Sequence, residues 1–458
     1  MTEDREPNVV QRGANQLVLG AADALRDRFW QIGVGVSLAL VVVAGFWQRW
    51  HVLAVNELPV GIDGYFYPVQ VRSLLEHGVL RYPASPVTFY WMTPFALVTD
   101  PIVGAKLGAA LGGALVAIPA YGVGKILGGH RGAGLVAAVL AATTATSCFL
   151  AFEFVKQGIG LTVALAALWA ILVAIERRTR RSVVIAAFAI AIAFATHKLA
   201  AGLVIAIVLP ELAHLARREL FGRRLIYLVL VAIGVALGIV LLGVIAPKRF
   251  VSPSDLALVK DLVSSTAHVT APALVFPDRE LHFAYEPLLA GLVCIAALSV
   301  AWSRPAVTGP HHRLTAIAIC ALGILLALPW LSVDDPQGLG FRLRVAAFVP
   351  LALGGAIIVG ALRHALFGCA IAAVLVAYEL PRAYLAGVQP AGVVPTSPVL
   401  AGAVANARGK IPEGKTVIVP ERHILFMVDW YTRAAVNLRP ELVPLSERIR
   451  MVGLVWIG

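Results

Sequence analysis

The feature that most constrains this chain is a series of long apolar runs separated by short polar connections. A helix rises about 1.5 Å per residue, so roughly 20 apolar residues are enough to cross the hydrocarbon core of a bilayer. Because lipid offers the backbone no hydrogen-bond partners, each run is expected to be helical. The runs begin near Ile32, Ile102, Ala133, Gly158, Ser182, Leu199, Leu225, Pro287, Leu314, Val345 and Leu366. The sequence therefore predicts an all-α polytopic membrane protein with about 11 transmembrane helices.

The composition argues against the main alternatives. Of the 458 residues, 59% are hydrophobic and only 14% are charged, which does not describe a soluble surface. The formal net charge of +12 would suit nucleic-acid binding, but the arginines gather in short clusters between apolar runs. The four cysteines fall in or beside apolar segments, so we expect packing residues and no disulfide framework. We therefore expect membrane lipids, and no nucleic acid, as partners.

The basic clusters also predict the orientation. If the N-terminus is cytoplasmic, the cytoplasmic connections are residues 125–131, 176–181, 217–224, 304–313 and 363–364, and each is short and basic. This is the distribution that the positive-inside rule expects. The polar start of the chain does not resemble a cleavable signal, so the first helix is expected to stay as an anchor. Abundant Ala, Val, Leu and Arg favour a bacterial source and hence a multi-pass protein of the plasma (inner) membrane.

This orientation divides the chain into three regions. Residues 1–31 form a cytoplasmic N-terminal segment, residues 32–380 a transmembrane domain, and residues 381–458 a small extracytoplasmic C-terminal domain. Two long outer loops, residues 51–100 and 247–286, interrupt the transmembrane domain. In the C-terminal domain the pattern predicts a helix at 398–408, a strand at 416–419 and a helix at 421–435, which is a small α/β unit. Function is expected on this outer side.

The first outer loop contains the most informative motif, Gly-Ile-Asp-Gly-Tyr-Phe-Tyr at residues 61–67. Apolar residues at helical spacing follow, up to a glycine, Gly78, that is placed to end a helix. Such an amphipathic helix is expected to lie in the membrane interface. For Asp63 itself, one interpretation is a helix N-cap that accepts backbone N–H bonds.

The Asp-Gly-Tyr-Phe-Tyr segment after the first span, with a helix ending in Glu-His-Gly, resembles the first loop of the GT-C superfamily of integral membrane glycosyltransferases. Oligosaccharyltransferase catalytic subunits, protein O-mannosyltransferases and aminoarabinose transferases belong to that superfamily. The resemblance implies a GT-C-like fold and an inverting glycosyltransferase. The enzyme would move a sugar from a polyprenyl-phosphate-linked donor to a glycan, lipid or protein acceptor on the outer side of the membrane. It also implies that Asp63 is catalytic, as a base or as an acceptor-orienting group.

The second outer loop, residues 152–157, departs from the pattern of these relatives. Oligosaccharyltransferases tend to carry two acidic residues here that bind a metal ion together with the first-loop aspartate, whereas this loop offers only Glu153. Asp63 and Glu153 are therefore the candidate ligands for Mg²⁺ or Mn²⁺, and metal dependence is left open. Lys156 lies one helical turn away, so a plain Glu–Lys pair at a helix end is the alternative.

Basic residues on the outer side are unexpected under the positive-inside rule, and they suggest a pocket for the donor phosphate. Guanidinium groups present two N–H donors to phosphate oxygens, whereas lysine supplies a point charge. Snorkelling to lipid headgroups is the alternative for each of them. The candidates are Lys106, His197, Lys198, Arg342 and Arg344.

Acceptor contacts are the least constrained part of the predicted site. By analogy with oligosaccharyltransferases, Glu280 in the long loop is a candidate, and so is Tyr65 beside the catalytic aspartate. In the C-terminal domain, Val-Asp-Trp-Tyr at 428–431 is interpreted as helix packing. Two other functions stay open: a transporter or flippase of lipid-linked substrates, and a non-catalytic subunit with a GT-C-like fold.

Overall fold

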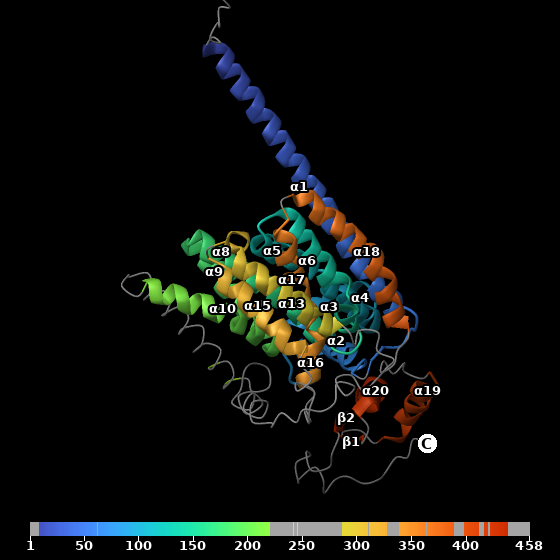
Figure 1. The fold of residues 1–458 in the computed structure, drawn as a ribbon. Helices are drawn as coiled ribbons and strands as arrows, with labels where there is room; N and C mark the ends of the chain where they lie inside the picture. Colours follow the sequence, from blue (N-terminus) through green and yellow to red (C-terminus); the bar gives the residue numbers. More distant parts are fainter. Residues whose placement is uncertain are drawn as a thin grey trace, which may run out of the picture.

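A computed structural model shows a bundle of long helices with a small unit packed against one end of it (Figure 1). The structure describes residues 9–61, 63–219, 241, 245, 286–309, 311–327, 339–362, 364–388, 398–411, 416–419 and 422–437. The predicted span near Leu225 and nearly all of the predicted loop 247–286, including Glu280, lie outside these residues. The first helix, α1 (Val9–Leu53), projects from the bundle at the end opposite the C-terminal unit (Figure 1).

The bundle confirms a polytopic helical membrane protein. Six helical segments of the described residues are long and apolar enough to cross a membrane, and four shorter apolar helices accompany them. The helices of the first half are α4 (Pro101–Ala114), α5 (Ala117–Gly128), α6 (Arg131–Thr143), α7 (Ala145–Phe149), α8 (Val155–Arg177), α9 (Arg180–Thr196) and α10 (Lys198–Glu219). Those of the second half are α13 (Glu286–Ser303), α14 (Pro305–Thr308), α15 (Arg313–Ala327), α16 (Leu339–Val345), α17 (Phe348–Gly360) and α18 (Ala365–Val388). Helix α1 begins at Val9, inside the predicted N-terminal segment, although only Arg28–Leu53 is apolar enough to span.

Small residues allow the helices to approach closely. A Cβ atom on Gly104 would lie 2.5 Å from the backbone of Ala96, and one on Gly108 would lie 2.6 Å from the Met92 side chain. These contacts join α4 to α3 (Val87–Val98), an apolar helix of the first loop that the sequence analysis did not predict. The cysteines are free, as predicted, and three of the four are buried. Close packing through small side chains is the usual way in which helices associate in lipid.

The third span is broken at Thr144, whose extended backbone separates α6 from α7. Two buried charges stabilise the break. The Arg49 guanidinium donates to the carbonyl oxygen of Ala142 (2.7 Å) and to the hydroxyl of Ser147 (2.7 Å). On the other side, the Glu286 carboxylate accepts the backbone N–H of Ala145 (2.7 Å) and that of Thr146 (2.9 Å). A cation thus meets carbonyl oxygens at a helix C-terminus and an anion meets N–H groups at a helix N-terminus, as the helix dipoles favour.

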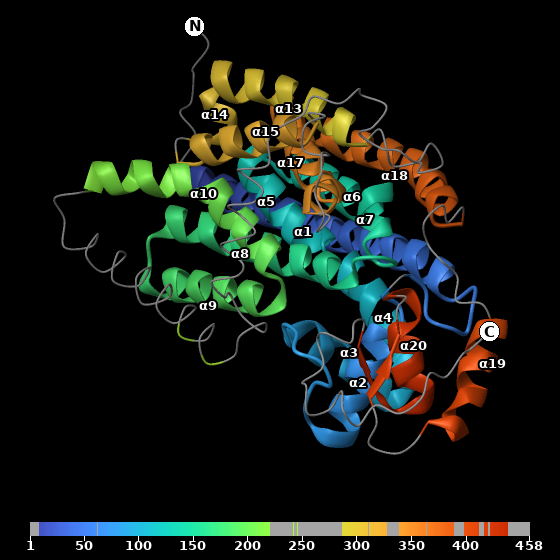
Figure 2. The same ribbon diagram turned by 90° about the horizontal axis from the view of Figure 1, so that it is seen from below.

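The first loop, residues 51–100, packs between the bundle and the C-terminal unit. Its helix α2 (Phe66–His77) ends, as predicted, at Gly78, which has φ 70° and donates its N–H to the Leu74 carbonyl oxygen. The predicted apolar face of α2 is buried at Tyr67, Val71 and Leu74. Figure 2 shows α2, α3 and α4 beside α20 of the C-terminal unit.

The C-terminal unit, called the tail from here on, has the predicted α/β character. It contains α19 (Pro398–Asn406), a 3-10 turn (Ala407–Lys410), β1 (Thr416–Ile418), α20 (Arg422–Thr432) and β2 (Ala435–Asn437). Strand β2, which the sequence analysis assigned in part to the second helix, pairs in parallel with β1, with Val417 opposite Val436. The tail has its own small apolar cluster, and Tyr65 of the first loop is part of it.

Candidate functional site

Asp63 lies in a tight turn that precedes α2. The turn is closed by the bonds Gly64 N–H to Gly61 carbonyl (3.0 Å) and Phe66 N–H to Asp63 carbonyl (2.9 Å). The helix begins at Phe66, and its N-cap residue is Tyr65, without a capping side-chain bond. Asp63 is therefore not the N-cap of α2, and the N-cap interpretation is wrong.

Gly61 brings the first and second loops together. Its φ is 92°, a conformation that favours glycine, and a Cβ atom there would lie 2.2 Å from the Phe152 carbonyl oxygen. The same Cβ position is 3.5 Å from the Glu153 carboxylate, which is 7% exposed. The backbone contact therefore places the second loop directly beside the turn that carries Asp63.

Tyr67 connects the same two loops from within α2. Its hydroxyl oxygen accepts the backbone N–H of Lys156 at 3.2 Å. The pKa of Tyr67 is raised, first by burial and then by the Asp63 carboxylate and, more weakly, by Glu153. The Lys156 N–H and the Arg342 guanidinium act in the opposite direction. Tyr67 therefore keeps its proton at neutral pH, within electrostatic reach of both carboxylates and of Arg342.

Four basic side chains converge next to these carboxylates. Lys156 interacts electrostatically with Arg342, Lys198 and Asp63. His197, 9% exposed in the turn between α9 and α10, faces Lys156, Arg342 and Lys198. We call Lys156, His197, Lys198 and Arg342 the basic cluster. Lys156, Lys198 and Arg342 thus bring like charges close together, which is a suitable place for an anion to bind.

Local packing fixes the members of the basic cluster. The Arg342 guanidinium lies over the ring of Phe154, 5.0 Å from its centroid, and the Arg342 carbonyl oxygen accepts from the Gln157 amide at 2.6 Å. The His197 ring accepts the Ala200 N–H at 3.3 Å, at the start of α10. Through Phe154 and Gln157 the second loop is thus tied to α16, far away in the sequence, whereas the His197 bond is local to the start of α10.

The predicted donor-phosphate residues do not all belong to this cluster. His197, Lys198 and Arg342 come together, whereas the charged neighbours of Lys106 are Asp100 and Glu57. The Lys106 ammonium donates to the Asn56 carbonyl oxygen and so ties α4 to the start of the first loop. Arg344 is 1% exposed at the end of α16. A donor-binding role for Lys106 and Arg344 stays a prediction.

Lys156 is the member of the basic cluster that the sequence analysis interpreted otherwise, as a partner of Glu153. The signal that could have identified it is its position. It is a basic residue at the first turn of α8, in a connection that the sequence analysis assigned to the outer side, where the positive-inside rule expects few. The broken helix α6–α7, whose buried charges the sequence analysis missed, is what delivers this residue to the site.

The carboxylates fit a metal ion poorly. Among the described residues, no three His, Cys, Asp or Glu side chains are grouped so that they could hold a metal ion. Lys156 interacts with Asp63 and supplies positive charge where a cation would otherwise be needed. The predicted Mg²⁺ or Mn²⁺ ligands, Asp63 and Glu153, are thus neighbours in a site with protein cations of its own, and we derive no step through a metal.

Of the predicted acceptor residues, only Tyr65 is described. It is 3% exposed, and its hydroxyl lies 3.1 Å from the hydroxyl of Tyr431 in the tail. Its ring also packs against Trp430. The packing interpretation of residues 428–431 is therefore confirmed, and a contact of Tyr65 with the acceptor stays a prediction.

The comparisons with known proteins concern the fold of the chain. Residues 83–242 match the model of a family described as dolichyl-phosphate-mannose-protein mannosyltransferase. That match begins after α2, so it does not include Asp63. In a comparison with curated protein sequences, none matched the chain.

Solved structures extend the likeness to most of the chain. The oligosaccharyltransferase of Archaeoglobus fulgidus, in complex with Zn and sulfate, has a TM-score of 0.57 at 15% identity, over 88% of this chain and 62% of that one. ArnT from Cupriavidus metallidurans in the apo state has a TM-score of 0.55 at 15% identity, over 90% of this chain and 86% of that one. The same protein bound to undecaprenyl phosphate gives 0.50 at 15% identity, over 88% and 85%.

The chain spans less than two thirds of the length of the oligosaccharyltransferase. At this level of identity the likeness concerns the fold. The family match and the three structures together show that this chain has the fold of the GT-C superfamily of integral membrane glycosyltransferases.

Proposed function

We propose that the chain is an inverting glycosyltransferase that moves a sugar from a polyprenyl-phosphate-linked donor to an acceptor on the outer side of the membrane. One observation carries this proposal. The turn with Asp63 and the basic cluster, which come from distant parts of the sequence, meet at one place. Three of the four cluster members were predicted to bind the donor phosphate. ArnT, which has the same fold, was solved bound to undecaprenyl phosphate.

In this mechanism the basic cluster binds the phosphate of the donor. The acceptor oxygen attacks the anomeric carbon while the bond from that carbon to the phosphate oxygen breaks. The polyprenyl phosphate leaves with the electron pair, and Lys156, Lys198 and Arg342 stabilise its added charge. A single displacement of this kind inverts the anomeric centre.

Asp63 orients the acceptor and takes its proton. A phosphate is already a good leaving group, so the donor side needs little acid catalysis, whereas the acceptor gains from a general base. Such assistance is worth roughly 100-fold to 10,000-fold. Tyr67, which keeps its proton, is placed to donate a hydrogen bond inside the site.

We further propose the orientation that the basic connections predict, with the N-terminus in the cytoplasm of a bacterium and the tail outside. The division into residues 1–31, 32–380 and 381–458 belongs to the same proposal. In this orientation the sugar is transferred at the outer leaflet, with the acceptor entering from the aqueous side, under the tail.

The proposal is tested by sugar transfer from lipid-linked donors with purified protein, comparing Asp63→Asn with Asp100→Asn. Both substitutions remove one carboxylate from the first loop. Asp100 is an exposed N-cap that accepts the N–H groups of Ile102 (2.7 Å) and Val103 (3.1 Å), and asparagine caps as well as aspartate. We expect kcat to fall by roughly 100-fold or more in Asp63→Asn and to change by less than about twofold in Asp100→Asn.

Full activity of Asp63→Asn would overturn the role of Asp63. If the wild-type protein instead carries lipid-linked sugars across proteoliposomes without forming a new glycosidic bond, the chain is a flippase and the enzyme assignment is wrong.

A further inference from the structure

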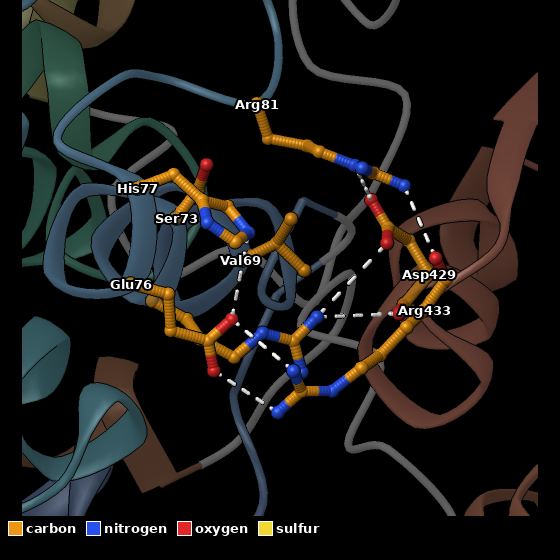
Figure 3. Close-up of a pocket in the computed structure, with 8 residues that line it drawn as sticks. Val69, Ser73, Glu76, His77, Arg81, Asp429 and Arg433 are labelled. Atoms are coloured by element: carbon orange, nitrogen blue, oxygen red, sulfur yellow. Dashed lines mark hydrogen bonds and ion pairs between the residues drawn. The ribbon is translucent and has the colours of Figure 1, made fainter.

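The tail meets the first loop around a buried carboxylate, Asp429, whose side chain is 1% exposed (Figure 3). The hydroxyl of Tyr82 donates to it at 2.5 Å, and the Nε of Arg81 donates at 3.3 Å. The Arg72 guanidinium lies 4.0 Å from its other oxygen. Two arginines of the first loop therefore share one acid that the tail supplies.

Arg72 also binds the backbone at the C-terminal end of α20. From the middle of α2 it donates to the carbonyl oxygens of Trp430 (2.7 Å) and Asp429 (3.3 Å), and its guanidinium lies 4.4 Å from the centre of a Trp430 ring. The C-terminal end of α20 thus points its carbonyl oxygens at an arginine. Arg72, Arg81 and Asp429 line a pocket of about 100 Å³ between α2 and α20, and none of the predicted site residues does.

The tail also contacts the residues that follow the Asp63 turn. Tyr65, two residues after Asp63, is held by the tail through its bond to the Tyr431 hydroxyl and its packing on Trp430. On the opposite face of α2, Tyr67 is bound to the second loop. The start of α2 is therefore in contact with both the tail, through Tyr65, and the second loop, through Tyr67.

We propose that Asp429 is a positioning residue, which holds α20 against α2 and thereby fixes the turn in which Asp63 faces the acceptor. This inference rests on the proposed function of Asp63. Without the Asp429 charge, Arg72 and Arg81 would face each other without their shared counter-charge, and the tail would lose its buried attachment. A displacement of about 1 Å at a catalytic group costs on the order of 100-fold in rate.

A second ion pair at the same interface provides a matched control. Arg433 and Glu76 pair at 3.0 Å, but their side chains are 55% and 34% exposed (Figure 3). Water screens such a pair, so its loss has little effect. Asp429→Asn and Glu76→Gln thus make the same chemical change at one interface, the first in a buried position and the second in an exposed one.

The test measures kinetics and backbone hydrogen exchange on the full chain in nanodiscs. For Asp429→Asn we expect kcat to fall about 10-fold to 100-fold, with the KM for the donor within about twofold, because the basic cluster is untouched. Exchange should speed up at the amides of residues 64–72 and stay unchanged in α3. For Glu76→Gln we expect wild-type values in both measurements, and Asp429→Glu should recover part of the lost kcat.

The outcomes separate this inference from the proposed function. Unchanged exchange at residues 64–72 in Asp429→Asn would show that Asp429 does not hold α2. Faster exchange with an unchanged kcat would show that the contact does not position Asp63. An equal loss of kcat and donor affinity, with faster exchange throughout the bundle, would indicate a merely structural role. If the wild-type protein transfers no sugar at all, the proposed function fails, and the exchange measurement still decides whether Asp429 holds α2.

Discussion

Two groups of charged side chains differ in their surroundings: Arg49 and Glu286 are buried, whereas Lys156, Lys198 and Arg342 of the basic cluster are only partly buried. Arg49 and Glu286 are surrounded by backbone carbonyl and N–H groups that match their charge. In the basic cluster, Lys156 has two further cations, Arg342 and Lys198, among its charged neighbours, together with the Asp63 carboxylate. A charge matched by protein groups stabilises the fold, whereas a set of like charges is suited to a ligand that completes it. Substitutions in the two groups should therefore differ in what they change.

The largest loss of stability is expected from Arg49→Met. The side chain keeps its length but leaves the Ala142 carbonyl and the Ser147 hydroxyl without their donor. We expect the free energy of unfolding to fall by roughly 2 to 4 kcal/mol. Unfolding by SDS, followed by circular dichroism, measures it. A loss below about 0.5 kcal/mol would mean that the break between α6 and α7 does not depend on this arginine.

Glu286→Gln should cost less. The two N–H groups at the start of α7 are bonded to different oxygens of the carboxylate, so the amide would present its NH2 group to one of them and that buried donor would lose its acceptor. The expected loss is about 1 to 3 kcal/mol in the same unfolding experiment. A variant as stable as the wild type would show that water or a neighbouring group replaces the carboxylate.

Gly113→Ala tests the space around Arg49 without removing a charge. A Cβ atom at this position would lie 2.7 Å from the Arg49 Nε, so the buried guanidinium would have to move. We expect a loss of about 1 to 2 kcal/mol. The control is Gly202→Ala in α10, where nothing lies within 4 Å of the new atom, so stability should be equal or slightly higher. Equal effects of the two substitutions would contradict the close fit around Arg49.

The smallest change in stability is expected from Lys198→Gln. Lys198 is only half-buried and lies near other cations of the basic cluster, so the loss of its charge should leave the free energy of unfolding within about 0.5 kcal/mol of the wild type. A loss of stability as large as that of Glu286→Gln would show that Lys198 stabilises the fold as Arg49 and Glu286 do. The difference between these two residues and the basic cluster would then be wrong.

The sequence predicted much of this molecule for clear physical reasons. Apolar runs predict membrane helices because lipid admits few other structures, and the glycine after α2 predicts its end because of its left-handed backbone. The turn around Asp63 was identified by resemblance, and three of the four basic cluster residues were identified because the predicted orientation puts them on the outer side.

What the sequence did not reveal depends on contacts between distant residues. The Glu286 carboxylate accepts a backbone N–H at the start of α7, 141 positions earlier in the chain. No local sequence pattern predicts a cap from so distant a residue. Lys106 and Lys198 look alike in sequence, yet only the packing shows that one meets Asn56 and the other meets the basic cluster. Lys156 was assigned to Glu153 because the two are close in sequence, while the fold also brings it to Asp63.

The central claim, that Asp63 and the basic cluster form one phosphate site, is tested most directly by the affinity for undecaprenyl phosphate in nanodiscs. We expect Arg342→Gln and Lys198→Gln to weaken binding about 10-fold each, since each loses a charge-assisted bond. Asp63→Asn should bind equally well or more tightly, because it removes a negative charge near the phosphate. Arg433→Gln, which changes an exposed arginine of the tail, should bind like the wild type. Unchanged affinity in both cation variants, or weaker binding in Asp63→Asn, would contradict the account.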